Sequence, residues 1–379
     1  MISYWEQQNL IEYDHIIVGA GIVGLSTALE LRQRFPKSKI AVLERGFYSS
    51  GASSRNAGFA CMGSVTEILA DLKTMSEEEV IVLFEKRKNG LQKLRARLGD
   101  IKIGYTENGS YEIISKNEIA AIDKIEYLNR LLLPVSKIPA FQLADKKEDN
   151  FGFNPKYAQH LIENTLEGEL NAGKMMRALS DLCMDNRIEI KTGTEVTGFQ
   201  EEENKVSINI RNFSNQEQIT IYAQHCIFCT NAFSQQFFNE EEIKPGRGQV
   251  LITNPIPGLK WKGIFHFDQG YYYFREIDGR ILFGGGRNLD FEGETTYEFG
   301  LTELIQNELE NKLREIIIPN IPFTIANRWS GIMAFGPTKF PIVKAYSKRV
   351  FGAFRLGGMG VALGSEVAYE VACSVAQSK

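Results

Sequence analysis

The chain has 379 residues, enough for roughly two domains with a cleft between them. Hydrophobic residues make up 43% and charged residues 24%, which is typical of a folded globular protein and excludes a largely disordered chain or a membrane bundle. The formal net charge of −4 gives no general attraction to nucleic acid or to anionic lipid, so neither is expected as a partner.

The start of the chain does not resemble a secretory signal. Residues 1–14 contain Glu6, Glu12 and Asp14 and lack a basic start, an apolar segment and a small-residue cleavage site. No window of about 18 uninterrupted apolar residues occurs, so no membrane span is predicted. The number of cysteines, five, is odd, and they are scattered along the chain, unlike the closely spaced, even-numbered cysteines of a disulfide-bonded secreted domain. We therefore expect a cytoplasmic protein.

A glycine-rich turn follows the first predicted strand. Residues 13–18 are rich in β-branched side chains, a helix is predicted over 25–35, and a second strand over 39–43 ends at Glu44. Between strand and helix, Gly19, Gly21 and Gly24 form the Gly-x-Gly-x-x-Gly pattern of dinucleotide-binding folds. The helix N-terminus offers free N–H groups to a pyrophosphate, and Glu44 can accept hydrogen bonds from an adenosine ribose. This pattern alone suits NAD and FAD equally.

A second small-residue segment favours FAD. Residues 51–58 read Gly-Ala-Ser-Ser-Arg-Asn-Ala-Gly, which can align backbone N–H groups along an extended ligand. A flexible loop of small residues is the alternative interpretation of this segment taken by itself.

The middle of the chain predicts a mixture of helices and strands. Ser76 and Glu79 form a capping box before a helix with an apolar stripe. Residues 105–114 predict a hairpin around Asn108-Gly109, residues 116–133 a helix, and residues 145–150 a polar linker or loop. A helix is expected over 173–186, followed by strands over 188–223 with turns at Asn204 and Asn215.

The C-terminal part begins with a strand over 227–229. Further strands are predicted over 249–253, 271–276 and 280–283, the last two joined at Asp278-Gly279. A helix over 302–314, a strand over 350–356, a glycine turn over 357–360 and a terminal helix over 361–377 complete the pattern.

These elements predict an α/β protein with a Rossmann-like FAD-binding domain and an inserted antiparallel-sheet, α+β substrate domain. Because nucleotide-type elements occur at the start, middle and end, the FAD-binding domain is expected to be discontinuous, comprising residues 1–63, 151–240 and 325–379. The substrate domain then comprises residues 64–150 and 241–324.

The Cys-x-x-Cys pair does not predict a metal site. Cys226 and Cys229 lie in an apolar run that reads as a strand, where residues three apart point to opposite faces. The histidines likewise lack metal-ligand spacing, so no metal is predicted; they are His15, His160, His225 and His266.

Four blocks of sequence resemble the FAD-dependent amine and amino-acid oxidoreductases of the D-amino-acid oxidase superfamily. The resemblance is to the branch of glycine oxidase, sarcosine oxidase and γ-glutamylputrescine oxidoreductase. The blocks are residues 18–24 with Glu44 and Arg45, residues 51–58, residues 229–232, and residues 328–331 continued by 354–360.

The resemblance implies which residues contact FAD. Val196 would hold the adenine side through its backbone, residues 230–232 would pass near the diphosphate or ribityl chain, and residues 358–362 would lie at the pyrimidine end of the flavin. The implied cofactor-binding residues are Gly19, Ala20, Gly21, Ile22, Val23, Glu44, Arg45, Ala52, Ser53, Ser54, Arg55, Asn56, Ala57, Gly58, Val196, Thr230, Asn231, Ala232, Gly331, Gly358, Met359, Gly360, Val361 and Ala362. The residues that carry covalent flavin in some relatives are absent at the matching positions, so FAD is expected to bind non-covalently.

The substrate side rests on the predicted hairpin. Its turn pairs Ile277 with Arg280, which sets Tyr272 opposite Gly285 and Tyr273 opposite Gly284. Tyr272 is the expected substrate contact, and a change of face would substitute Tyr271 or Tyr273.

Two arginines are candidates for holding a substrate carboxylate. They are Arg328, next to Trp329, and Arg247. An apolar chamber that includes Tyr272, Trp329 and Phe335 would favour a neutral amine, so no side-chain base is required.

The resemblance therefore implies an FAD-dependent oxidoreductase. It would oxidise the C–N bond of a small amine or amino acid by hydride transfer to flavin N5, giving an imine that hydrolyses, with oxygen or another acceptor reoxidising the flavin. The alternatives are an FAD-dependent 2-hydroxy-acid dehydrogenase, an FAD-dependent tRNA-modifying enzyme, which the acidic balance disfavours, and a non-catalytic nucleotide-binding protein.

Overall fold

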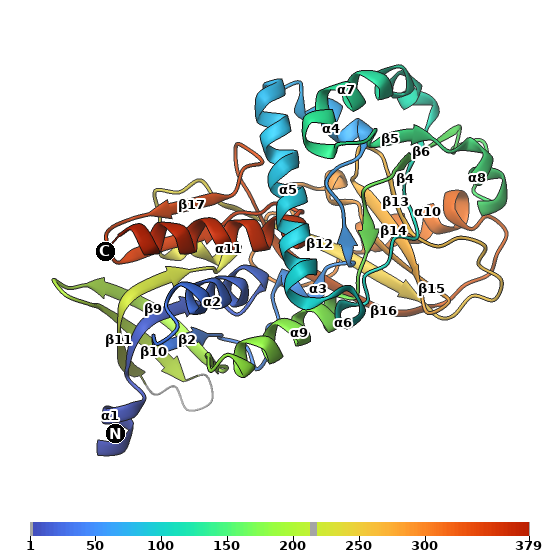
Figure 1. The fold of residues 1–379 in the computed structure, drawn as a ribbon. Coiled ribbons are helices and arrows are strands. Elements are labelled where there is room, and N and C mark those ends of the chain that lie inside the picture. Colours follow the sequence, from blue (N-terminus) through green and yellow to red (C-terminus); the bar gives the residue numbers. More distant parts are fainter. Residues whose placement is uncertain (1–2, 213–217, 379) are drawn as a thin grey trace.

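The computed structural model describes residues 3–212 and 218–378 and contains two eight-stranded sheets, which lie side by side in Figure 1. The predicted turn at Asn215 falls outside the described residues. The first sheet has its central strands parallel, as a dinucleotide-binding fold requires. In spatial order its strands are β17 (Ile342–Ala345), β18 (Val350–Phe354), β11 (Gln218–Phe228), β1 (Glu12–Val18), β2 (Ile40–Leu43) and β8 (Glu189–Lys191), with β10 (Val206–Asn212) and β9 (Thr194–Glu201) paired outward from β11.

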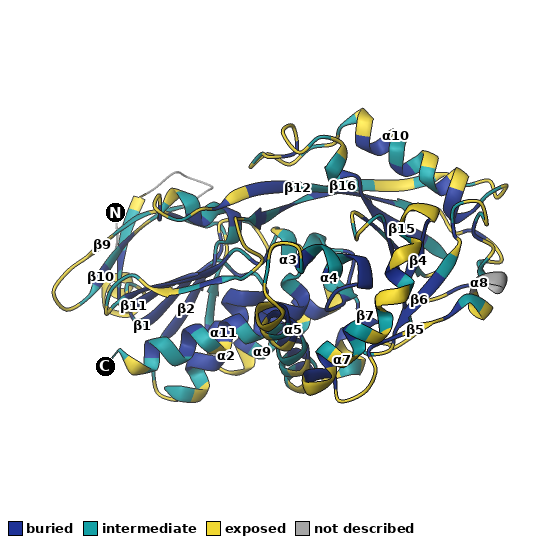
Figure 2. Cartoon of the chain, turned by 90° about the horizontal axis from the view of Figure 1, so that it is seen from above, coloured by how far each residue is buried: buried dark blue, intermediate teal, exposed yellow. Residues whose placement is uncertain are grey.

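Helices pack on one face of the first sheet, and strands pack on the other. Figure 2 shows α2 (Ile22–Arg34), α9 (Ala172–Asp185) and α11 (Gly360–Gln377) along one face, where their apolar side chains pack with Ile17. The strands β9 and β10 cover the opposite face, where Ile16 and Val18 are buried. Cys226 belongs to this second core and Cys229 to the first, so the two thiols lie on opposite sides, as predicted from their spacing.

The second sheet carries an aromatic core under α10 (Glu303–Lys312) and the π-helical turn Leu313–Ile317. Most of its strands are antiparallel, and only β13 and β4 pair in parallel. In spatial order the strands are β16 (Ile325–Phe335), β12 (Lys244–Thr253), β15 (Arg280–Gly285), β14 (Tyr272–Ile277), β13 (Ile264–Phe267), β4 (Ser110–Ile114), β6 (His160–Asn164) and β5 (Phe141–Leu143).

A long helix joins the two halves. Helix α5 (Glu77–Leu98) begins with the predicted capping box, in which Ser76 and Glu79 exchange hydrogen bonds. It packs closely on α11, because a Cβ atom on Gly90 would lie only 2.0 Å from the Ala362 carbonyl oxygen. The remaining short elements are α1 (Tyr4–Asn9), α3 (Ala52–Arg55), β3 (Phe59–Ala60), α4 (Val65–Asp71), α6 (Asp100–Ile103), α7 (Ile125–Ser136), α8 (Asp145–Phe151), β7 (Gly168–Glu169) and the 3₁₀ turns Lys116–Lys124, Asn231–Gln236 and Arg287–Leu289.

The α/β fold class is confirmed, but several sequence-based boundaries are wrong. Strand pairing assigns β6 and β16 to the second sheet, whereas the predicted boundaries at 151 and 325 gave them to the FAD-binding domain. Helix α5, predicted with the substrate domain, packs with its C-terminal half on α11 and with its N-terminal half on α7. Tertiary pairing decides these memberships, and a local pattern does not contain it.

Two local predictions are also wrong. The expected hairpin over 105–114 is absent, since only β4 forms there and its partners are the distant strands β13 and β6. The polar segment expected as a linker over 145–150 forms α8. Its first residue, Asp145, accepts a hydrogen bond from the Leu161 backbone N–H (2.9 Å) and contacts His160 of β6 (2.9 Å), which ties the start of the helix to β6.

Candidate active site

A cavity of about 860 Å³ lies between the first and second sheets. This volume is within the ~300–1,000 Å³ range of ligand sites in proteins. Most of the predicted cofactor-binding residues line it, namely Gly19, Gly21, Ile22, Val23, Glu44, Arg45, Ala52, Ser53, Arg55, Asn56, Ala57, Val196, Thr230, Asn231, Gly331, Gly358, Met359, Gly360, Val361 and Ala362. Seven separated stretches of chain therefore meet at one cavity.

The glycine turn is packed too tightly for any side chain at two positions. Gly19 has φ +101°, and a Cβ atom there would lie 2.8 Å from the Cys229 carbonyl oxygen. A Cβ atom on Gly24 would lie 1.8 Å from the carbonyl oxygen of Gly19. The turn therefore presents only backbone to the cavity, as a close approach by a pyrophosphate requires.

Glu44 supports this turn from below. Its carboxylate accepts hydrogen bonds from the backbone N–H groups of Ala20 (3.1 Å) and Gly46 (2.9 Å). Ala20 is buried beneath the turn and does not line the cavity, so it contributes through this bond. Glu44 itself is buried yet reaches the cavity wall, where its remaining lone pairs can accept from a ribose hydroxyl.

The small-residue segment 51–58 caps the glycine-turn helix. Ser53 Oγ accepts a hydrogen bond from the Ile22 N–H (3.0 Å), and Asn56 bonds to the Ser53 carbonyl oxygen (2.7 Å) and accepts from the Gly58 N–H (2.9 Å). This network fixes α3 against the start of α2. The segment is thus ordered by its own polar side chains, unlike a flexible loop of small residues.

Three of the predicted cofactor contacts lie behind the wall. Ser54 donates its hydroxyl to the Ser49 carbonyl oxygen (2.5 Å), Gly58 faces the backbone of Leu170, and Ala232 is fully buried in the core of the first sheet. Together with Ala20, they support lining residues and do not line the cavity themselves.

The N-terminus of α11 faces the cavity without a side-chain cap. Met359 is the N-cap residue, and residues 358–362 all line the wall. Because the first N–H groups of a helix have no partner within the helix, they are free to donate to a ligand there. The Met359 sulfur lies 3.8 Å from Cys61 Sγ, and both residues line the cavity.

The end of the cavity away from the glycine turn is an aromatic chamber, formed by Phe59, His266, Tyr271, Tyr273, Arg287, Phe291 and Phe335. The Tyr273 ring lies over Gly284, where a Cβ atom would be 2.7 Å from the ring. The ring centroid of Phe59 lies 5.1 Å from that of His266 and 5.5 Å from that of Tyr273. Burial lowers the pKa of His266 to about 4, so this ring is neutral at pH 7.

The hairpin register is confirmed, but the predicted face is wrong. Tyr272 pairs with Gly285 and Tyr273 with Gly284, as the turn implied. Tyr272 nevertheless does not line the cavity: it is 1% exposed and stacks on Phe267 in the aromatic core beneath α10. Because side chains alternate along a strand, its neighbours Tyr271 and Tyr273 line the chamber instead.

Neither arginine predicted for a substrate carboxylate reaches the cavity. Arg328 donates to Glu310 (2.5 Å) and Gln306 (2.6 Å) of α10 on the outer face of the sheet. Arg247 forms an ion pair with Glu294 (2.8 Å). Both predictions are therefore wrong, because each cation already has a protein anion on the side of β12 or β16 away from the cavity.

Trp329 also lies outside the cavity wall. Its indole N–H donates to the Arg55 carbonyl oxygen (2.9 Å), and Arg55 donates in return to the Ser330 carbonyl oxygen (2.9 Å). The predicted contribution of Trp329 to the substrate chamber is wrong; it ties β16 to α3. Phe335, at the far end of the same strand, does line the chamber.

Sequence reasoning missed a charged wall beside the chamber. Lys339 lies 2.5 Å from Asp71 and 3.2 Å from Glu67, and Arg87 lies 3.9 Å from Glu67. Burial alone would raise the pKa of Glu67, but the charges of Lys339 and Arg87 outweigh it and hold this pKa below its usual value. Two anions and two cations thus balance each other along this wall.

Two buried carboxylates hold the segment that leads into this wall. Glu112 accepts from Ser64 Oγ (2.8 Å) and from the Thr66 hydroxyl, and Glu167 accepts from the Gly63 N–H (3.0 Å) and Ser110 Oγ (2.7 Å). Burial raises the pKa of each to about 7. No sequence motif marks them, because their donors come from distant positions.

A parallel sheet with this glycine turn, a second sheet across the cavity and an uncapped helix N-terminus define a dinucleotide-binding oxidoreductase fold. The chain belongs to the DAO family, described as FAD dependent oxidoreductase, whose profile matches residues 14–373. The protein is accordingly an FAD-dependent oxidoreductase, and the backbone-lined turn and free α11 N–H groups fit that cofactor.

Known proteins resemble the chain over most of its length. It is 23% identical over 300 residues to the probable oxidoreductase OrdL of Haemophilus influenzae, covering 72% of this chain and 64% of that protein, which is less than two thirds of the relative's length. It is 26% identical over 350 residues to a mitochondrial L-2-hydroxyglutarate dehydrogenase of Nematostella vectensis, and this alignment covers 84% of this chain and 72% of that protein. The solved structure of glycine oxidase from Geobacillus kaustophilus shares the fold, with a TM-score of 0.77 at 20% identity. The superposition covers 97% of this chain and 96% of that chain.

Within the described residues, no helix is long and apolar enough to cross a membrane, and no cluster of three His, Cys, Asp or Glu side chains could hold a metal ion.

Proposed function

We propose that the protein oxidises the C–N bond of a small amine or amino acid to an imine, which then hydrolyses in water. The observation that carries this proposal is the continuous cavity, which runs from the glycine turn past the N-terminus of α11 into the aromatic chamber. A small substrate in the chamber would lie next to the flavin end of the dinucleotide.

When bound, FAD supplies a hydride acceptor at its N5 atom. The protein's own contribution at that end is the N-terminus of α11, where the N–H groups of residues 360–362 can donate to the pyrimidine edge and stabilise negative charge there.

The chamber favours a neutral amine. Phe59, Tyr273 and Phe335 exclude water from the reacting carbon, and desolvation disfavours an ammonium ion. The neutral His266 adds no repelling charge. A neutral amine held against the cofactor needs mainly alignment, so no side-chain base is assigned.

The cofactor contacts follow the lining residues. Gly19, Gly21 and Glu44 would hold the pyrophosphate and ribose, Val196 the adenine side, and residues 358–362 the flavin. The segment 51–58 holds no histidine or cysteine and residues 329–338 hold no cysteine, which supports non-covalent FAD. Tyr271 and Tyr273 replace Tyr272 as the proposed substrate contacts.

A second candidate is oxidation of the C–OH bond of a 2-hydroxy acid. It is favoured by the resemblance to an L-2-hydroxyglutarate dehydrogenase, whereas the resemblance to glycine oxidase favours the C–N bond. The cytoplasmic location and the use of oxygen or another carrier as acceptor stay predictions.

The test is the visible spectrum of the purified protein, recorded without oxygen against a panel of amines, amino acids and 2-hydroxy acids. Loss of flavin colour with an amine or amino acid supports the proposal. Loss of flavin colour with 2-hydroxy acids alone supports the second candidate instead. A protein that takes up no FAD, or one whose flavin no donor reduces, overturns both. Flavin that stays with the acid precipitate would refute only the non-covalent assignment.

A further inference from the structure

The chain between β15 and α10 borders the cavity. Two of its aromatic side chains, Phe291 and Phe299, line the cavity and are also 46% and 42% exposed, so they lie at the boundary between the cavity and solvent. We call residues 295–301 the aromatic loop, because Tyr297 and Phe299 lie within it.

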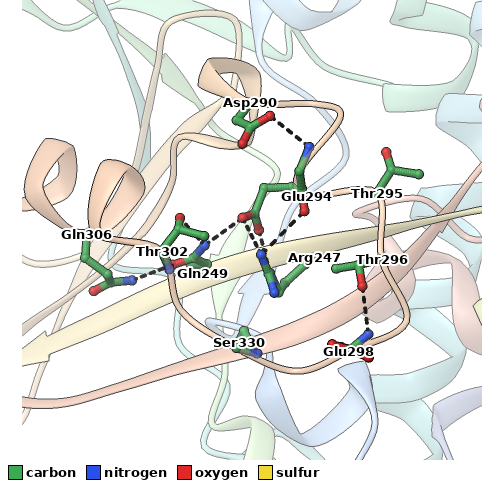
Figure 3. Close-up of polar contacts among 12 residues, drawn as sticks. Arg247, Gln249, Asp290, Glu294, Thr295, Thr296, Glu298, Thr302, Gln306 and Ser330 are labelled. Atoms are coloured by element: carbon green, nitrogen blue, oxygen red, sulfur yellow. Dashed lines mark hydrogen bonds and ion pairs between the residues drawn. The ribbon is translucent and has the colours of Figure 1, made fainter.

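Both ends of the aromatic loop are fixed on one buried side chain of β12. The amide N–H groups of Gln249 donate to the Glu294 carboxylate (2.9 Å), just before the loop, and to Thr302 Oγ1 (2.9 Å), just after it. The amide oxygen of Gln249 accepts from the Thr302 backbone N–H (3.1 Å). Figure 3 shows Glu294 and Thr302 meeting at Gln249, so the loop starts and ends at the same point.

A buried ion pair strengthens the first of these ends. Glu294 is fully buried, and the Arg247 guanidinium donates from Nε and Nη2 to its two carboxylate oxygens, at 2.8 Å in each case. The Arg247 backbone N–H also donates to the Glu294 carbonyl oxygen (2.7 Å). Two-point, charge-assisted bonding fixes both position and orientation, and breaking a buried pair is costly. The base of the aromatic loop is therefore held firmly.

The middle of the aromatic loop reaches the nucleotide end of the cavity. The ring centroid of Tyr297 lies 5.6 Å from that of Phe233, and the guanidinium carbon of Arg45 lies 3.8 Å from the Phe233 centroid. The guanidinium carbon of Arg55 lies 4.3 Å from the centroid of Phe299. Both arginines line the cavity and belong to the segments proposed to bind the cofactor.

These ring contacts are weak compared with the base of the loop. Within residues 3–212 and 218–378, no hydrogen bond or ion pair joins residues 295–299 to the segments that carry Arg45, Arg55 and Phe233. An exposed contact between a ring and a cation, or between two rings, contributes little on its own. The middle of the loop can therefore leave the nucleotide end while its base stays in place.

From this arrangement we infer that the aromatic loop is a lid over bound FAD, hinged at Gln249 and held closed by Tyr297 and Phe299. FAD enters and leaves when these two rings separate from the nucleotide end. Glu294 is a positioning residue, because its ion pair with Arg247 sets the direction of the loop. The inference goes beyond the proposed function and does not depend on which bond the protein oxidises.

Tyr297 gives the sharpest test. It does not line the cavity, so it can affect FAD only through the loop. Exchange of bound FAD for isotopically labelled FAD, followed on the holoenzyme by mass spectrometry, measures the dissociation rate. Quenching of flavin fluorescence on mixing FAD with the apoprotein measures the association rate. Tyr297→Ala should raise both rates about two- to tenfold and leave the Kd for FAD nearly unchanged, because a closed lid hinders entry and exit alike.

Variants at the base of the loop test the positioning role. Glu294→Ala leaves the buried Arg247 unpaired and should raise the FAD dissociation rate at least as much as Tyr297→Ala does. Glu294→Gln keeps an acceptor oxygen for Arg247 and Gln249 and should restore most of the wild-type rate. Tyr369→Ala is the matched control, because this tyrosine on α11 is 39% exposed against 41% for Tyr297, contacts Arg34 and lies outside the cavity wall.

The lid is overturned if Tyr297→Ala exchanges FAD at the wild-type or the Tyr369→Ala rate, or if dissociation rises while association does not, since FAD would then bind less tightly without a gate. Exchange as fast in Glu294→Gln as in Glu294→Ala overturns the positioning role. If the exchange rates follow the expectation but no amine or amino acid reduces the flavin, the proposed function fails while the lid stands.

Discussion

The cavity has a nucleotide end built from backbone and a chamber end built from side chains. At the nucleotide end, Gly21 and the α11 N-terminus present N–H groups, and the geometry follows from short stretches of sequence. At the chamber end, Phe59, Tyr273 and Phe335 come from three distant parts of the chain. A ligand site made of backbone is thus encoded locally, whereas one made of side chains depends on strand pairing and on which face each strand buries.

The largest effect should come from the backbone end. Gly24→Ala would bring a Cβ atom to 1.8 Å from the Gly19 carbonyl oxygen, so the turn must open, and we expect the protein to lose bound FAD or to fail to fold. The ratio of flavin to protein absorbance after purification measures this. Gly198→Ala, where nothing lies within 4 Å, is the control and should retain FAD. Full flavin content in Gly24→Ala would show that the turn tolerates a side chain.

Two neighbouring tyrosines at the start of β14 should differ in their contribution to stability. Tyr272→Ala removes a ring that is 1% exposed, and the free energy of unfolding should fall by ~3–5 kcal/mol, as for other buried aromatic residues. Tyr271→Ala, at a position that is 41% exposed, should lower it by less than ~1 kcal/mol. Urea denaturation of the FAD-loaded protein measures both. Similar losses would contradict the placement of Tyr272 in the core and of Tyr271 outside it.

The buried carboxylates behind the chamber predict a pH dependence of stability. The pKa of Glu112 is about 7 in the folded protein against 4.5 for an ordinary glutamate, so the folded state holds more protons across this window and its stability falls as the pH rises through it. The difference corresponds to ~3 kcal/mol. Glu112→Gln should therefore flatten the fall between pH 4.5 and 7.

Glu85→Gln, at an exposed position of α5, is the control for this profile. Urea titrations at a series of pH values measure it. A Glu112→Gln profile that runs parallel to the wild type would mean that Glu112 does not remain protonated when folded.

The smallest effect should come from the ion pair on the outer face of the second sheet. Arg328 and Glu310 are partly exposed, so Arg328→Met should lower the free energy of unfolding by only ~1 kcal/mol or less. Flavin content and reduction kinetics should stay at wild-type values. A large loss of turnover in Arg328→Met would instead indicate that Arg328 contacts the substrate.

The sequence predicts the nucleotide end well because the signals there are contiguous. The order strand, glycine turn, helix and strand over residues 13–43 is present, and Glu44 meets the turn as its position suggests. The two-residue turn at Asp278-Gly279 also fixed the register of its hairpin correctly.

The chamber could not be predicted in the same way. Register does not say which face of β14 is covered by α10, so Tyr272 and Tyr273 could not be told apart. Arg247 and Arg328 look like free cations until Glu294 and Glu310 pair with them from distant segments.

Strand β16 fixes the distance between the part of the cavity that would hold the cofactor and the chamber that would hold the substrate. One residue, Gly331, borders the cofactor cavity, and Phe335, four residues further along the same extended strand, borders the chamber. Because a strand rises ~3.3 Å per residue, these two walls are held ~13 Å apart by covalent geometry. A longer or shorter substrate is thus more readily admitted by inserting or deleting residues where the strand ends than by exchanging side chains along it.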